Sequence, residues 1–204
     1  SVLGARLLGP AEPGHLLIFG AGQVARALID AYTTIFPSIA TVTLCVRRLQ
    51  SADWLRQKLS EDERRRTFAL RVSTDPAKVV PLADIVATAT TSETPVLQGD
   101  WLTAGAHVDL VGAYTVNMRE ADDNTLQRGA LYVDCSDTTV NQIGELVVPL
   151  ASGAIKPDSV LGDLYDLIVQ SPGDGVRIWD PQQITIFKNG GGAHLDLMVA
   201  HHLM

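Results

Sequence analysis

The chain has 204 residues, of which 46% are hydrophobic and 19% are charged, and its formal net charge is −7. This balance is typical of a compact globular protein of one domain or slightly more, and it argues against disorder. The acidic charge offers no general attraction to nucleic acid or to anionic lipid, and no apolar run reaches the roughly 18 residues of a membrane span. With only two cysteines, Cys45 and Cys135, we expect buried free thiols in a soluble, cytoplasmic protein.

Short apolar runs rich in Val, Ile and Leu alternate with segments of helical period. The runs that we predict as strands span residues 15–19, 41–46, 68–72, 84–89, 107–111, 131–133 and 184–187. Strands that are buried on both faces of a parallel sheet are short and almost continuously apolar, as these runs are. The alternation predicts an α/β fold with a doubly wound, mostly parallel sheet over residues 15–189.

Helices are predicted between these runs and at both ends of the chain. After the first run, the apolar residues have the spacing of one helix face; they are Val24, Ala27, Leu28, Ala31 and Tyr32. Further helices are predicted over residues 52–66, 122–128, 144–153 and 160–169, with a loop over 170–180. We interpret residues 1–14 as the remnant of a preceding helix and linker. Residues 190–204 are predicted to form a terminal helix whose apolar end needs a partner subunit or a missing segment to bury it.

The sharpest motif is a glycine turn that follows the first predicted strand and opens the first predicted helix. Residues 20–25 read Gly-Ala-Gly-Gln-Val-Ala, which matches the G-x-G-x-x-A pattern of dinucleotide-binding turns. Gly20 permits a tight turn, Gly22 lets the backbone approach a pyrophosphate, and Ala25 lets the helix pack closely on the strand. The free N–H groups at the helix start suit phosphates, so we predict a Rossmann-type dinucleotide-binding domain.

The end of the second predicted strand discriminates between nicotinamide cofactors. An acid at this position binds the adenosine ribose of NAD, whereas this chain continues Cys-Val-Arg-Arg over residues 45–48. The guanidinium groups of Arg47 and Arg48 suit a ribose 2′-phosphate, which a carboxylate would repel. The pattern favours NADP(H), with NAD(H) as the alternative.

Several later segments carry a family signature. Residues 83–92, 105–113, 119–122, 132–134 and 184–190 resemble, in order and spacing, the ornithine cyclodeaminase/mu-crystallin family. The resemblance implies NAD(P)-linked chemistry at a carbon–nitrogen centre. It also implies a set of residues that line the dinucleotide, beside the two motif glycines; they are Ala21, Gln23, Val24, Arg47, Arg48, Thr90, Thr91, Val111 and Asn189.

The resemblance implies an NADP(H)-dependent reductase of the ketimine or cyclic imino-acid type. Its substrate would be a small carboxylated imino or amino acid, and the complete protein would be a homodimer. A non-catalytic NADP(H)-binding protein of the mu-crystallin kind is the alternative. An ornithine cyclodeaminase is a weaker alternative, because Tyr114 stands where the resemblance places the acting aspartate.

No catalytic residue is assigned. The resemblance implies that the substrate-carboxylate arginine and the catalytic lysine lie in a first, substrate-binding and dimerising part that this chain does not include. It also implies that the terminal helix over 190–204 returns to that part. His15 and His107 begin predicted strands, where a structural role is expected. His194 and His201 share a helix face but lack a third ligand, so no metal site is predicted.

Overall fold

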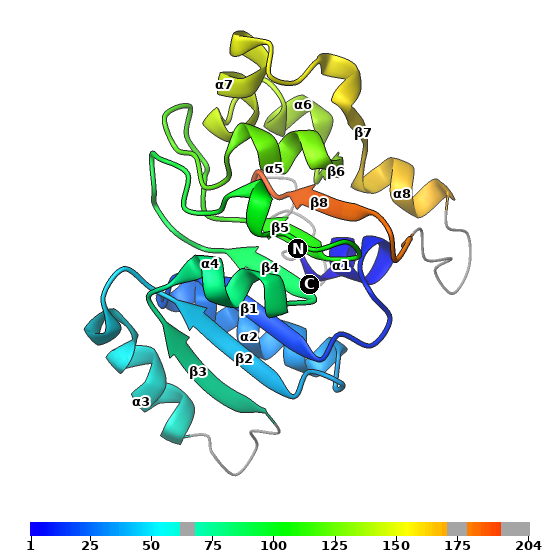
Figure 1. Cartoon of the computed structure of the whole chain (residues 1–204). Helices are drawn as coiled ribbons and strands as arrows, with labels where there is room; N and C mark the ends of the chain where they lie inside the picture. The colour runs from blue at the N-terminus through cyan, green and yellow to red at the C-terminus, as the bar shows by residue number, and fades with distance from the viewer. Residues whose placement is uncertain (62–67, 171–178, 193–204) are drawn as a thin grey trace, which may run out of the picture.

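The computed structural model describes residues 1–61, 68–170 and 179–192 (Figure 1). The sheet in this part of the chain has eight parallel strands in the order β3-β2-β1-β4-β5-β8-β6-β7. The strands are β1 (His15–Phe19), β2 (Thr41–Cys45), β3 (Ala69–Ser73), β4 (Ile85–Thr88), β5 (His107–Leu110), β6 (Gly129–Val133), β7 (Val160–Asp163) and β8 (Ile184–Lys188). The last strand in sequence, β8, lies between β5 and β6 (orange in Figure 1).

Eight α-helices connect or flank these strands in the described residues. They are α1 (Val2–Leu8), α2 (Gln23–Ile35), α3 (Asp53–Glu61), α4 (Pro76–Val79), α5 (Asp123–Arg128), α6 (Ser136–Thr139), α7 (Gly144–Ser152) and α8 (Leu164–Gln170). Single 3-10 turns lie at Leu49–Ala52, Val80–Leu82, Gly99–Trp101 and Pro157–Ser159.

Helices cover both faces of the sheet, so the sheet is doubly wound as predicted. On one face, α2 and α3 share a buried cluster with Leu16 and Ile18 of β1. On the other face, α5 and α7 share a cluster with Leu17 of β1 and with strands β4, β5, β6 and β8. These three β1 side chains are fully buried, and each contributes about 1.5–3 kcal/mol of hydrophobic stabilisation.

The predicted helix over residues 160–169 is wrong in its first part. Residues 160–163 form the edge strand β7, which pairs only with β6 among the described strands, and α8 begins at Leu164. An edge strand needs one buried side only, and its Leu161 is 55% exposed, so the run lacks the continuous apolar character of the inner strands. Asp163 ends the strand because its Oδ1 accepts the N–H groups of Tyr165 and Asp166, at 3.0 and 3.2 Å.

Five other helix predictions have mixed outcomes. The seven predicted strands are all present, and the helices predicted after the first strand and over 122–128 and 144–153 are confirmed. The predicted helix 52–66 is helical over Asp53–Glu61, and residues 62–66 lie outside the described part, as do 171–178 of the predicted loop. Residues 190–192 have no regular structure, and the remainder of the predicted terminal helix, with His194 and His201, lies outside the described residues.

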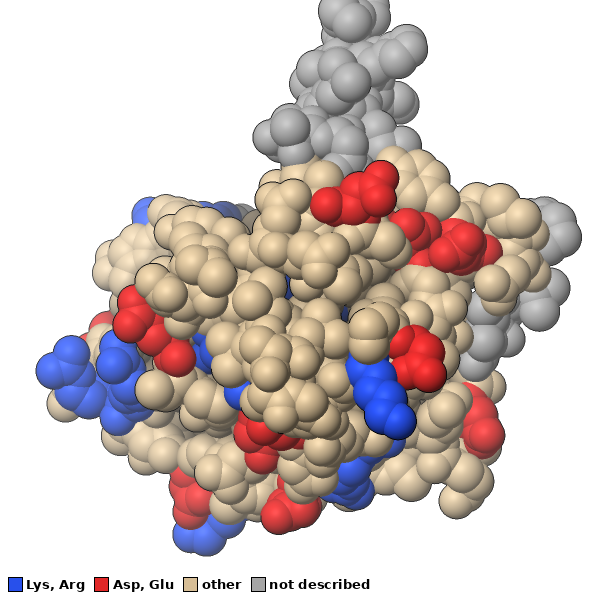
Figure 2. All heavy atoms as spheres, turned by 90° about the horizontal axis from the view of Figure 1, so that it is seen from above, with Lys and Arg blue, Asp and Glu red and all other residues tan. Residues whose placement is uncertain are grey.

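The surface charge is dispersed. On the face seen in Figure 2, acidic and basic side chains are scattered among a larger area of uncharged residues and do not gather in a patch of one sign. Within the described segments, no helix has the length and apolar character that crossing a bilayer requires.

Candidate functional site

The glycine turn lies where the strand order of the sheet reverses, between the carboxyl ends of β1 and β4. Gly20 has φ +112°, its N–H donates to the Cys45 carbonyl at 3.0 Å, and a Cβ there would stand 2.6 Å from the Ala89 carbonyl oxygen. Both the backbone conformation and the close approach of β4 therefore require glycine. This switch point is where open parallel sheets bind nucleotides.

Gly22 is a glycine for a different reason. It precedes the first turn of α2 with φ −91°, and a Cβ there would meet no atom within 4 Å. The fold itself leaves room for a side chain at this position, so glycine keeps open the space in front of the helix. No side chain caps α2, and its first turn carries no acid. The open space and the uncapped N–H groups fit a pyrophosphate.

The first turn of α2 also separates the motif into an exposed and a buried side. Gln23 and Val24 are exposed at the carboxyl ends of β1 and β4, the region that we call the crevice. Ala25 is fully buried in the cluster that α2 shares with Leu16 and Ile18 of β1. Ala21 is half-buried and packs against the same cluster. The small residue at position 25 thus packs the helix closely against β1, as the motif predicts.

Arg47 and Arg48 are exposed just beyond the end of β2. A carboxylate that the sequence analysis did not consider lies nearby. Burial chiefly, and the charge of Asp75 in addition, raise the pKa of the Cys45 thiol to about 11. Asp75 lies beyond the end of β3 and pairs with the Lys78 ammonium at 2.8 Å. The ends of β2 and β3 therefore carry two exposed arginines and an acid that is already paired.

The opposite wall of the crevice is built around Glu120, which is fully buried. Its Oε1 accepts the N–H and the hydroxyl of Thr90, both at 2.7 Å. Its Oε2 accepts the hydroxyl of Thr88 at 2.6 Å and the N–H groups of Gly112 and Ala113 at 2.7 and 3.2 Å. One carboxylate thus ties the end of β4 to the end of β5; we call this arrangement the Glu120 clamp.

The two threonines that were predicted to line the dinucleotide, Thr90 and Thr91, have different environments. The Thr90 hydroxyl donates to Glu120, and the Thr90 Cγ2 lies 3.7 Å from the position of a Gly20 Cβ. Thr91 is exposed. Gly112 has no room for a side chain, because a Cβ would stand 2.1 Å from the Thr90 carbonyl oxygen and 2.5 Å from Glu120 Oε1. Val111, half-buried, is held by its N–H to the Thr88 carbonyl at 3.1 Å.

Lys188 holds the same backbone from the side of β8. It is fully buried, and its Nζ donates to the carbonyls of Leu110 and Ala113 at 3.1 and 2.7 Å. Burial lowers the pKa of Lys188, and nearby carboxylates, with Glu145 the largest of these, oppose that shift. Asn189 follows with its N–H on the Leu110 carbonyl at 3.0 Å and its Nδ2 on Ser1 Oγ at 3.0 Å.

The two histidines that begin strands have structural environments. His15 contacts the Leu82 carbonyl and the Thr43 hydroxyl at 2.9 and 2.8 Å. His107 is fully buried, which lowers its pKa to about 3, and its Nδ1 lies 2.9 Å from Thr185 Oγ1. Among the residues that the structure describes, no three His, Cys, Asp or Glu side chains come together to hold a metal ion.

A model of the ornithine cyclodeaminase/mu-crystallin family matches residues 1–203. The chain belongs to this family. It is 49% identical over 203 residues to a Delta(1)-pyrroline-2-carboxylate reductase of Paracoccus denitrificans, covering 100% of this chain and 62% of that protein. Ketimine reductase mu-crystallin of Mus musculus is 29% identical over 200 residues, which are 98% of this chain and 58% of that protein.

A solved structure has the same fold. The Thermococcus litoralis Delta(1)-pyrroline-2-carboxylate reductase, determined with NADH and L-proline, superposes with a TM-score of 0.87 at 23% identity over 98% of this chain and 59% of that one. The chain therefore spans about three fifths of the length of these relatives.

In this chain, all the predicted cofactor residues lie at the end of the sheet where the strands have their carboxyl ends. They follow the carboxyl ends of five strands that are neighbours in the order β2-β1-β4-β5-β8, although they come from positions 20 to 189 of the sequence. The roles of Glu120, Lys188 and Asp75 were not predicted from the sequence. The acid in Arg-Glu-Ala-Asp at 119–122 was part of the family signature, but nothing in its spacing indicated that it would reach the ends of β4 and β5.

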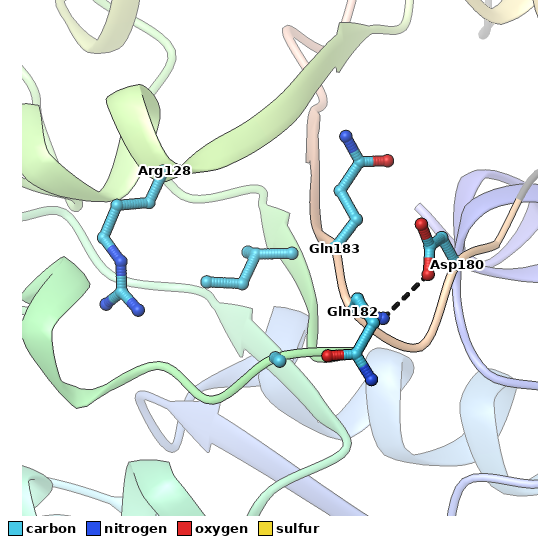
Figure 3. Close-up of a pocket in the computed structure, with 6 residues that line it drawn as sticks. Arg128, Asp180, Gln182 and Gln183 are labelled. Atoms are coloured by element: carbon cyan, nitrogen blue, oxygen red, sulfur yellow. Dashed lines mark hydrogen bonds between the residues drawn. The ribbon is translucent and has the colours of Figure 1, made fainter.

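Two hollows lie at the opposite edge. The first, about 400 Å³, is lined by Ala104, Arg128, Asp180, Gln182, Gln183 and Ile184, and the second, about 390 Å³, shares Arg128 and Gln183 with it. Figure 3 shows Arg128 across the first hollow from Asp180, whose Oδ1 accepts the N–H of Gln182 at 2.8 Å. These residues precede or begin β5, β6 and β8, so they lie at the amino ends of the strands. Arg128 is occupied by the carbonyls of Gly99 and Leu102.

Proposed function

We propose that the protein containing this chain is an NADP(H)-dependent reductase of a small cyclic imino acid, and that this chain supplies its dinucleotide-binding domain. The observation that carries the proposal is the glycine turn at the switch point of the sheet, in a chain that is 49% identical over 203 residues to a pyrroline-2-carboxylate reductase. A bound nicotinamide supplies a hydride to the imine carbon. Holding that ring in position is the task of the protein, since hydride transfer depends mainly on geometry.

The residues of this chain would share that task between the two sides of the crevice. Gly22 and the first turn of α2 would bind the pyrophosphate, and the Glu120 clamp would hold the backbone at Thr90 and Gly112 as a fixed wall beside the reacting ring. A rigid wall matters because small displacements of the reacting carbon cause large losses of rate.

The preference for NADP(H) is part of the proposal and rests on the adenosine end. Arg47 and Arg48 are exposed there, and the adjacent Asp75 is paired with Lys78. A relative in the same fold was solved with NADH, so the choice between cofactors needs a direct test. We expect the Kd of NADPH to be at least about tenfold below that of NADH, since one charge-assisted contact contributes about 1.5–3 kcal/mol. Loss of this ratio in Arg47→Ala/Arg48→Ala would support the assignment, and equal affinities in the unsubstituted protein would overturn it.

The activity is tested by following NADPH absorbance with Δ1-pyrroline-2-carboxylate as substrate. Consumption of NADPH with formation of proline is expected. Cofactor binding without turnover on any cyclic imino acid would instead favour the mu-crystallin kind of binding protein. Release of ammonia from ornithine would favour a cyclodeaminase, against which the exposed Tyr114 argues. A cytoplasmic homodimer belongs to the same proposal, and native mass measurement of the complete protein tests the dimer.

A further inference from the structure

A second acid lies beneath the Glu120 clamp and has no part in the chemistry proposed above. Glu145, in the first turn of α7, is fully buried. Its Oε2 accepts the N–H of Glu120 at 2.8 Å, and its Oε1 accepts the N–H of Ala121 at 2.9 Å. Both of its oxygens therefore bind the backbone of the segment whose own carboxylate builds the crevice wall.

The contacts form a chain from Glu145 to the crevice. Glu145 fixes the backbone of Glu120, and the side chain of Glu120 fixes Thr90 and Gly112. These contacts are closely packed, since a Cβ on Gly112 would stand 2.5 Å from Glu120 Oε1. A shift of the Glu120 backbone would therefore disturb the hydrogen bonds that hold the ends of β4 and β5.

We propose that Glu145 is a positioning residue for the nicotinamide side of the crevice, acting through the Glu120 clamp, and that its ionisation makes the order of this wall depend on pH. The proposal deepens the proposed function, on which its catalytic consequence rests. Its structural consequence, a wall that loosens on protonation, stands without that function.

The two hydrogen bonds explain why ionisation matters. An ionised carboxylate offers acceptors on both oxygens, whereas a protonated one carries a donor on one of them and weakens the bond to the N–H that faces it. Protonation of Glu145 would thus release part of its hold on Glu120 or Ala121. The charged groups that face Glu145 are Lys188 from β8 and Glu120 itself, and α7 carries no other titratable side chain.

The titration falls in an accessible range. Burial is the main cause that raises the pKa of Glu145, to about 7; Lys188 opposes the rise and Glu120 adds to it. Lys188 in turn faces Asp109 and Asp134 besides these two glutamates. The hydrogen bonds of the wall should therefore be better formed above neutral pH than below it, although the buried charge lowers the global stability of the fold at the higher pH.

The test combines hydrogen exchange with cofactor binding on the complete protein, without substrate. Exchange is measured at about pH 6 and about pH 8, corrected for the intrinsic rate, in peptides that contain Thr90, Gly112 and Ala113. We expect about fivefold or greater loss of protection at the lower pH, because these N–H groups bind the Glu120 clamp. NADH is the probe for binding over the same range, because the 2′-phosphate of NADPH itself titrates near pH 6. Its Kd should rise about three- to tenfold as the pH falls.

Variants separate Glu145 from other titrating groups. Glu145→Gln should remove both pH dependences and leave the wall close to its low-pH state throughout. Glu12→Gln, which removes one exposed carboxylate at the opposite edge of the sheet, should behave as the unsubstituted protein does. Protection independent of pH in the unsubstituted protein would overturn the proposal even if Glu145→Gln failed to fold, and an unchanged pH dependence in a folded Glu145→Gln would overturn it too. Failure of imino-acid reduction with intact pH-dependent protection would count against the proposed function alone.

Discussion

Gly22 and Gly20 stand two residues apart, and the structure predicts opposite consequences for the same substitution. Gly22→Ala places a methyl group in open space at an ordinary φ, so only the weaker helix-capping of alanine affects the fold. We expect a loss of about 0.5–1 kcal/mol in folding stability, which lowers Tm by roughly 1–4 °C at this chain length. Binding should suffer far more, because the methyl group occupies the space that the pyrophosphate would use.

The magnitude of the binding loss follows from the contacts at stake. Backbone N–H groups that donate to a charged phosphate each contribute about 1.5–3 kcal/mol, so displacement of the phosphate from one of them raises Kd about 10- to 150-fold. Gly20→Ala is the matched comparison. Its φ of +112° and its 2.6 Å approach to the Ala89 carbonyl predict a loss of about 2–4 kcal/mol in folding stability.

Thermal unfolding and NADPH fluorescence titration on both variants provide the assay. Gly22→Ala should be a stable protein that binds poorly, and Gly20→Ala should be measurably unstable before any ligand is added. Unchanged NADPH affinity in a folded Gly22→Ala would refute the placement of the pyrophosphate at this turn. A Gly20→Ala variant as stable as the unsubstituted protein would refute the strain ascribed to the turn.

Three further predictions concern the buried charges and the wall. Lys188→Met should destabilise the fold by about 3–5 kcal/mol in urea unfolding, because Glu120 and Glu145 would remain buried without their cation. A loss below about 1 kcal/mol would contradict this. Gly112→Ala should lower stability by about 2–4 kcal/mol and abolish cofactor binding, since its Cβ meets backbone 2.1 Å away, and a variant with native Tm would disprove the close packing. The raised pKa of Glu145 should make stability greatest below about pH 4.5 as far as this group is concerned, and about 3 kcal/mol of it should be lost as the pH rises to about 7. Urea unfolding at about pH 5 and about pH 8 should show this loss in the unsubstituted protein and not in Glu145→Gln. The same change in unfolding free energy between the two pH values in both proteins would argue against it.

The inner strands could be predicted because burial on both faces leaves a clear pattern in the sequence. Leu16, Leu17 and Ile18 point to alternate faces and are all fully buried, so the run is apolar throughout. The edge strand β7 escaped because one of its sides is exposed and its Asp163 and Gly162 resemble a helix start or a turn. The position of β8 between β5 and β6 has no local signal, because the order of strands is set by contacts between segments far apart in sequence.

The candidate site likewise has features that the local sequence predicts and features that it does not. The glycine turn could be predicted because its residue types are set by the local backbone conformation, as the positive φ of Gly20 shows. The Glu120 clamp could not, because its partners Thr90 and Gly112 are 30 and 8 residues away and meet it only through the packing of β4 against β5. Thr90 shows the consequence: the family resemblance implied that it lines the dinucleotide, but its hydrogen bond to Glu120 could not be predicted.

Packing alone does not account for an acid at position 145. An apolar side chain of similar volume would avoid the penalty of about 3 kcal/mol that the buried carboxylate carries at neutral pH. It would also leave the N–H groups of Glu120 and Ala121 without an acceptor, at about 1–3 kcal/mol each. The two effects are of similar size, so global stability hardly distinguishes the two choices. An apolar side chain and a carboxylate differ in how they hold Glu120, because only a carboxylate accepts the N–H groups of Glu120 and Ala121 at once. The choice of residue at position 145 should therefore affect the crevice wall more than the stability of the fold.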